Sequence, residues 1–75
     1  MFEKEEELNK FVLEMENKIK EHDEVYGDSW KTEKIEYLEQ RLITKINEFK
    51  LTKNHNKLLS VANLSMLLYV RMKND

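Results

Sequence analysis

Glutamates three residues apart are the first feature of this chain that could do chemistry. Glu33, Glu36 and Glu39 are spaced so that a helix would place their carboxylates on one face, and magnesium prefers such oxygen ligands. A magnesium site of this kind also needs acids on a facing helix, and residues 57–74 contain none. The acids by themselves therefore do not favour a metal site. The earlier glutamates are more simply a solvated face, which includes Glu3, Glu7, Glu14 and Glu21.

Basic side chains form a second candidate site around the polar connection at residues 52–56. They could bind phosphate, either on a nucleotide that is not turned over or on a nucleic acid. The net charge is −2 and the chain has a single glycine, so it is acidic overall and lacks a glycine-rich anion loop. We therefore favour a solvated basic face for these residues, which are Arg41, Lys45, Lys50, Lys53 and Lys57.

Four other side chains could take part in a site. His22 and His55 have no neighbouring nucleophile and no metal-ligand spacing, so both fit surface or cap positions. A lone Trp30 ahead of a helix more often closes a core over the helix ends than it stacks on a base. Asn63 lies in an apolar run and, once buried, must hydrogen-bond a neighbour or its own counterpart across a symmetry axis. The simpler role for Asn63 is to specify packing register, as a buried asparagine does in coiled coils.

Helices must position all of these residues. The chain has 75 residues, no proline and one glycine, and it is rich in Glu, Lys and Leu, which lose little rotamer freedom in a helix. Apolar residues at helical spacing predict a first helix over residues 2–22. We expect this helix to end before residues 23–29, where Gly27 is the one position at which a positive φ costs little.

Thr32 is the predicted N-cap of a second helix, with Glu33 and Glu36 in its first turn, where the helix dipole favours acids. After the short connection at residues 52–56, a third helix should fold back antiparallel, with Asn54 or Asn56 as its cap. The expected fold is a single all-α domain over residues 1–75, built as an antiparallel, three-helix bundle-like protomer. The apolar stripe of the second helix consists of Ile35, Leu38, Leu42, Ile46 and Phe49.

The third helix is too apolar for a single contact surface. Residues 58–72 carry apolar side chains on more than one face, so one face packs within the chain and another needs a second subunit. So short a chain buries only about 60% of its unfolded surface, and without cysteine it has no disulfide to compensate. We expect a homo-oligomer, either a dimer or a dimer of dimers. The predicted interface includes Leu59, Asn63, Met66, Leu67 and Val70.

Three stretches of the sequence also carry a family resemblance. They are residues 21–32 (EHDEVYGDSWKT), 36–42 (EYLEQRL) and 60–69 (SVANLSMLLY). Over residues 20–72 the chain resembles the MazG-like all-α nucleoside triphosphate pyrophosphohydrolases, in particular their small phage and archaeal forms. Members of that family hydrolyse nucleoside triphosphates to monophosphates, using magnesium held by Glu-x-x-Glu on one helix and Glu-x-x-Asp on the next. The resemblance implies nucleotide contacts for Trp30, Lys31 and Asn63.

The metal ligands of that family are mostly missing from this chain. The first carboxylate pair falls on Lys45 and Glu48, and the second falls on Lys57 and Ser60. Only Glu48 keeps its carboxylate, and charged lysines cannot ligate magnesium and would repel it. The resemblance therefore implies a scaffold that has lost its metal site and needs no cofactor, and we expect Glu48 to pair with one of the two lysines.

Three functions follow as hypotheses. The first is a non-catalytic binding or regulatory module that acts through an oligomeric scaffold, with a protein or a nucleotide as its possible partner. The alternative is a magnesium-dependent nucleoside triphosphate pyrophosphohydrolase that uses Glu48 with acids the pattern does not reveal. A weaker alternative is nucleic-acid binding through the basic connection.

The expected location is the cytoplasm, without a membrane partner. The acidic start of the chain, FEKEEE at residues 2–7, is unlike the basic start and apolar middle of a signal peptide. The longest apolar run, residues 58–72, is too short and too often interrupted to span a bilayer. The small size and the Lys- and Asn-rich composition point to a viral or plasmid origin.

Overall fold

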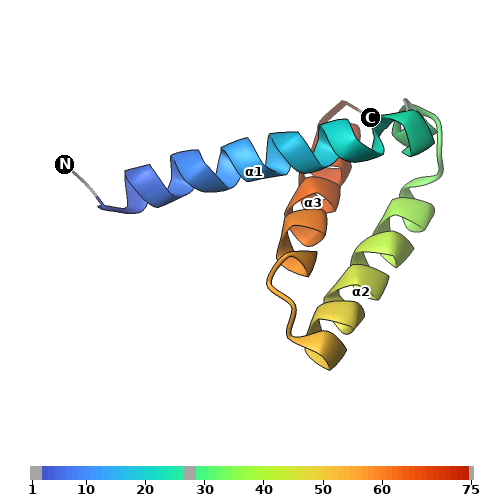
Figure 1. Ribbon diagram of the computed structural model, residues 1–75. Helices are drawn as coiled ribbons and strands as arrows, with labels where there is room; N and C mark the ends of the chain where they lie inside the picture. The colour runs from blue at the N-terminus through green and yellow to red at the C-terminus, as the bar shows by residue number, and fades with distance from the viewer. Residues whose placement is uncertain (1–2, 27–28, 75) are drawn as a thin grey trace.

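The protein is all-helical in the part of the chain that the structure describes. The computed structural model describes the backbone of residues 3–26 and 29–74, and the side chains of these residues outside 22–29. Within these ranges there are three α-helices and a short 3-10 turn, and no strand occurs, which confirms the all-α prediction (Figure 1). None of the described helices is long and apolar enough to cross a membrane. The elements are α1 (Glu3–Tyr26), η1 (Ser29–Lys31), α2 (Ile35–Thr52) and α3 (Lys57–Asn74).

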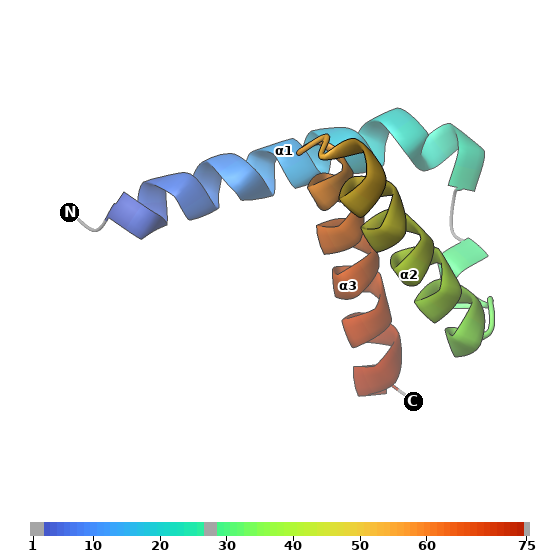
Figure 2. The same cartoon turned by 90° about the horizontal axis from the view of Figure 1, so that it is seen from below.

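Helices α2 and α3 form an antiparallel hairpin and lie side by side in both views (Figures 1 and 2). Part of the apolar surface of each helix packs between the two. Leu38 on α2 is fully buried, and Leu59 on α3 is 9% exposed. No other apolar side chain among the described residues is buried to this degree, so this part of the chain has a very small core.

The α2–α3 connection is ordered by local hydrogen bonds rather than by glycine. Lys53 takes a left-handed conformation with φ of 56°, and its N–H donates to the Phe49 carbonyl at 2.7 Å, which ends α2. The Thr52 hydroxyl accepts the N–H of Asn54 at 3.2 Å, and the Asn54 side chain accepts the N–H of Asn56 at 3.0 Å. Asn54 therefore orders the turn that leads into α3.

The beginning of α2 differs from the prediction. The N-cap residue is Lys34 in an extended conformation, without a side-chain capping bond, so the expectation of a Thr32 cap is wrong. The reason is tertiary: the Arg71 guanidinium on α3 donates to the carbonyls of Trp30 and Glu33, at 2.7 and 2.6 Å. These bonds hold the chain outside α2 up to Glu33, through η1 and the turn that follows it. The carboxylate of Glu33 then pairs with Arg41 at 3.2 Å instead of joining the first turn of the helix.

Helix α1 is longer than expected and is only partly supported. It continues to Tyr26 rather than ending near residue 22, because no proline or glycine interrupts the chain before position 27; Gly27 itself lies outside the described residues. Both views show α1 lying across α3, with its N-terminal half projecting beyond the hairpin on the side of α3 away from α2 (Figures 1 and 2). We call Glu3–Leu13 the overhang, because every side chain in it is exposed and Met15 is the first that is partly buried.

Candidate functional site

Glu48 and two lysines form an ion-pair cluster where α2 and α3 meet. Glu48 lies in the last two turns of α2, Lys45 lies one turn before it, and Lys57 is the first residue of α3. The ammonium of Lys57 lies 3.0 Å from Oε1 of Glu48, and that of Lys45 lies 3.5 Å from the same oxygen. The prediction that Glu48 pairs with a lysine is confirmed, and the carboxylate in fact binds both. We call Lys45, Glu48 and Lys57 the Glu48 cluster.

The local fold explains why these side chains meet. A spacing of three residues puts Lys45 and Glu48 on the same face of α2. The four-residue connection brings the first turn of α3 back alongside the last turns of α2, so that Lys57 lies opposite Glu48. The three side chains are 32–35% exposed, so solvent screens their interaction only in part.

The charges of the cluster keep Glu48 ionised. The hydrogen bond from Lys57 is the main reason why the pKa of Glu48 lies below its ordinary value of 4.5. The positive charges of Lys45 and Lys57 lower the pKa further, while partial burial acts in the opposite direction. The group is therefore a fixed anion that joins two helices.

Glu48→Gln is expected to lower the free energy of unfolding only slightly near neutral pH. It should also abolish the small loss of stability that the unmodified chain shows in acid. The folded pKa of Glu48 is lower than the unfolded one, so its stabilisation is fully present above pH 4.5 and is lost as the pH falls through the lowered pKa. Urea unfolding of both chains between pH 7 and pH 3 measures the difference. Lys57→Gln should remove most of the same pH dependence, since Lys57 is its main cause; equal profiles for all three chains would contradict the ion pairs.

The Glu48 cluster does not fit a magnesium ion. Magnesium needs a set of oxygen ligands, and here two ammonium groups occupy the only carboxylate. Ser60 lies on α3 one turn beyond Lys57 and adds a hydroxyl rather than a charge. Within residues 3–26 and 29–74 no group of three or more His, Asp and Glu side chains could hold a metal. The donor set is that of an ion pair between helices.

The remaining basic residues do not gather into one site. Arg41 is bound to Glu33, and it lies three turns of α2 away from the connection. The ammonium of Lys53 lies over the Phe49 ring, 5.6 Å from its centroid, and Lys50 is exposed. The predicted basic patch is therefore divided between the Glu48 cluster, the Arg41–Glu33 pair and separate lysines near the connection.

Trp30 and Lys31 lie at the opposite end of the hairpin from the Glu48 cluster. They belong to η1, which precedes α2, whereas Glu48 is 13 residues into that helix, or about 20 Å along its axis. Trp30 is partly buried, its carbonyl accepts the Arg71 guanidinium, and the Lys31 ammonium lies 5.9 Å from its ring centroid. This placement agrees with a Trp30 that covers the end of the helices, and a role in nucleotide binding stays a prediction.

Asn63 is the most buried polar side chain among the described residues. It is 7% exposed and lies on α3 where α1 crosses, and its amide nitrogen donates to the Met15 carbonyl at 3.2 Å. The prediction that a buried Asn63 bonds a neighbour is confirmed for this nitrogen. Its amide oxygen is also buried, and it accepts no hydrogen bond from the described residues. Such an oxygen carries a desolvation cost, which makes Asn63 a candidate for a specificity role rather than a source of stability.

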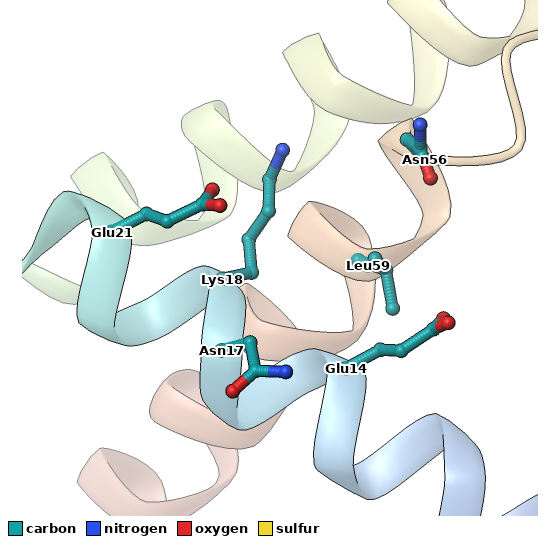
Figure 3. Close-up of a pocket in the computed structure, with 6 residues that line it drawn as sticks. All are labelled: Glu14, Asn17, Lys18, Glu21, Asn56 and Leu59. Carbon is teal, nitrogen blue, oxygen red and sulfur yellow. The ribbon is translucent and has the colours of Figure 1, made fainter.

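A hollow between α1 and the start of α3 is a feature that the sequence did not single out. Figure 3 shows Glu14, Lys18 and Glu21 along one face of α1, opposite Asn56 and Leu59 of α3. The spacing of the three charged residues was the available signal, and it is equally typical of a solvated face. The hollow is open and mostly polar, so it resembles a surface depression more than a binding pocket.

The predicted oligomer interface is only partly at the surface of the protomer. Met66 is 38% exposed, and Leu67 and Val70 are partly buried, whereas Leu59 and Asn63 are buried within the chain.

Comparisons of the chain with protein-family models, with curated proteins and with solved structures found no match. The interpretation of the Glu48 cluster thus rests on its geometry and charge, and the MazG-like resemblance stays a prediction.

Proposed function

We propose that this chain is a non-catalytic MazG-like helical protein that acts in the cytoplasm as a binding or regulatory module on an oligomeric scaffold. The observation that carries the proposal is the Glu48 cluster, in which two lysines bind the one carboxylate left at the family's ligand positions. Lys45 and Lys57 stand where the resemblance expects glutamates, so their charges replace that of the metal ion. The two ammonium groups then join α2 to α3 without a metal ion.

The enzyme alternative has weaker support. It needs carboxylates beyond Glu48, and the nearest glutamate series begins ahead of α2 with Glu33, whose carboxylate is held by Arg41. The described part of α3 contributes no acid at all. Nucleic-acid binding is also less favoured, because the basic side chains of the hairpin are divided rather than aligned along one surface.

Titration with nucleoside triphosphates tests the proposal directly. The protein is titrated with magnesium and a panel of triphosphates, and heat and released pyrophosphate are both followed. We expect no turnover, and binding without turnover would identify the module as a nucleotide sensor. Turnover above background that disappears in Glu48→Gln would overturn the proposal in favour of the pyrophosphohydrolase.

Restoring the family's carboxylates should create a magnesium requirement. Lys45→Glu, Lys57→Glu and Ser60→Asp together place four carboxylates at the hairpin end, where mutual repulsion should lower the melting temperature. Magnesium should then raise it again, with a linkage contribution of about 2.7 kcal/mol once the ion reaches one hundred times its Kd. Thermal melts with increasing magnesium measure this recovery.

The control changes the same amount of charge elsewhere. It uses three exposed positions that do not converge on one point of the hairpin, with the substitutions Lys50→Glu, Lys73→Glu and Ser65→Asp. Magnesium should leave the melting temperature of this control nearly unchanged. Equal responses of the two triple variants would show that positions 45, 48, 57 and 60 do not form a common site, and the alignment onto the family would be wrong.

A further inference from the structure

One side of α3 remains apolar and uncovered in the protomer. Leu58, Met66, Tyr69 and Met72 are 38–67% exposed, and Ala62 lies on the same stripe at helical spacing. The buried residues of α3, Leu59 and Asn63, border this stripe on the side where α1 crosses. We call Leu58, Ala62, Met66, Tyr69 and Met72 the outer face of α3.

The overhang carries a second uncovered apolar stripe. Leu8, Phe11 and Val12 are 59%, 38% and 49% exposed and recur at helical spacing. The same stripe continues through Met15, whose carbonyl is bonded by Asn63, so its C-terminal part already packs on α3. The overhang therefore extends a helix-packing surface beyond the end of its intrachain partner.

These two surfaces border one open corner of the molecule. Figures 1 and 2 both show the overhang projecting past α3 on the side away from α2. Four of the five side chains of the outer face are exposed and Ala62 is partly buried, so neither α1 nor α2 covers most of this face. A helix laid in this corner would bury apolar side chains from both elements at once.

The amount of exposed surface indicates an occupant of substantial size. The chain exposes 6119 Å². A compact monomer of 9.2 kDa exposes about 4,900 Å², so about 1,200 Å² more is open to solvent than expected. A stable protein–protein interface takes about 800 Å² from each partner. The excess is thus enough for a standard dimer interface.

Charge favours a second copy of the same chain as that occupant. The overhang holds four glutamates against two lysines, whereas α3 holds three basic residues and no acid over Lys57–Asn74. The overhang of one copy is therefore complementary to α3 of another in charge as well as in apolar surface. A two-fold arrangement uses both contacts twice, since each copy supplies one overhang and one α3.

We propose that two copies of this chain form a reciprocal dimer in which the overhang of each copy packs Leu8, Phe11 and Val12 on the outer face of the other copy's α3. The inference rests on the oligomer of the proposed function and specifies its interface. It places Met66 at the contact between copies and keeps Leu59 and Asn63 inside each protomer. The overhang is then supported along its whole length.

Cysteine cross-linking tests this contact, because the chain has no cysteine of its own. One chain carries Val12→Cys and the other, with a mass tag, carries Met66→Cys; the two are mixed, oxidised and separated by mass. Mixed cross-linked dimers should predominate over both same-chain products. Cross-links between two copies of the Val12→Cys chain, without mixed products, would overturn the reciprocal arrangement.

A matched control and a mass measurement separate the possible failures. Leu51 is 86% exposed at the far end of α2, so a Leu51→Cys chain mixed with the Val12→Cys chain should give few cross-links. Light scattering of the unmodified chain should give the mass of a dimer, and Tyr69→Asp should halve it while Leu51→Asp does not. A monomeric unmodified chain would overturn the proposed oligomer as well, whereas a dimer that Tyr69→Asp leaves intact overturns only this interface.

Discussion

Leu38→Ala is expected to lower the free energy of unfolding by about 2–5 kcal/mol, because the cavity it leaves lies in a core with few other buried side chains. Leu38 is the one fully buried side chain of the described residues. A chain of 75 residues has a total stability of about 4–11 kcal/mol, so the loss is a large fraction of it. Urea unfolding followed by circular dichroism measures the change, at one fixed protein concentration because the proposed assembly would stabilise the folded chain.

Leu51→Ala is the matched control for this prediction. It removes the same atoms from a side chain on the same helix that is 86% exposed, so its effect should stay within about 0.5 kcal/mol. Similar losses in the two variants would mean that Leu51 is buried in the assembled protein, or that Leu38 is not the centre of the core. A Leu38→Ala chain that unfolds like the unmodified one would contradict the packing of α2 on α3.

Apolar spacing was sufficient to predict the helices, and Leu38 belongs to the stripe that it defined. What spacing could not predict is how deeply each member of the stripe is buried. Leu38 is fully buried and Ile46, two turns later on the same stripe, is 40% exposed. The difference depends on where the neighbouring helices lie, and a periodic pattern carries no information on that.

The predicted helix boundaries are wrong where tertiary contacts decide them. Thr32 has good N-cap chemistry, but Arg71 on α3, which comes 38 residues after Glu33, binds the carbonyls of Trp30 and Glu33. The left-handed conformation of Lys53 could not be predicted either, since glycine or asparagine is the usual signal for that conformation. Local sequence rules describe the helix interiors better than the points where the chain leaves them.

The candidate site was predictable only in part. Pairing of Glu48 followed from residue spacing on two antiparallel helices, and the structure confirms it. The structure places the five basic residues in separate settings, because the interval of 16 residues from Arg41 to Lys57 covers a long helical segment and a turn. The overhang was also not predictable, since the stripe of α1 runs from Leu8 to Ile19 without a sign of where α3 ends.

Asn63→Asp is expected to destabilise the protein by about 3 kcal/mol or more at pH 7, because it places a carboxylate where one amide oxygen already lacks a donor. Burial should raise the pKa of the new carboxyl in the folded chain above its unfolded value. The variant should therefore lose stability as the pH rises from about 4 to 7 and recover when the carboxyl is protonated. Thermal unfolding across this pH range measures both effects.

Asn63→Leu separates stability from specificity at the same position. Leucine has the same branched shape and removes the unpaired oxygen together with the bond to the Met15 carbonyl, so the free energy of unfolding should stay equal or rise by about 1 kcal/mol. If Asn63 specifies how α1 crosses α3, the leucine variant should keep its stability but exchange the amide hydrogens of α1 faster, because the helix can slide on an apolar surface. Unchanged exchange would exclude that role. The same variant tests ligand binding by Asn63, with Asn17→Leu as an exposed control on α1. If only Asn63→Leu loses a nucleotide response and the exchange of α1 is unchanged, α1 has not moved, and Asn63 is assigned to ligand binding.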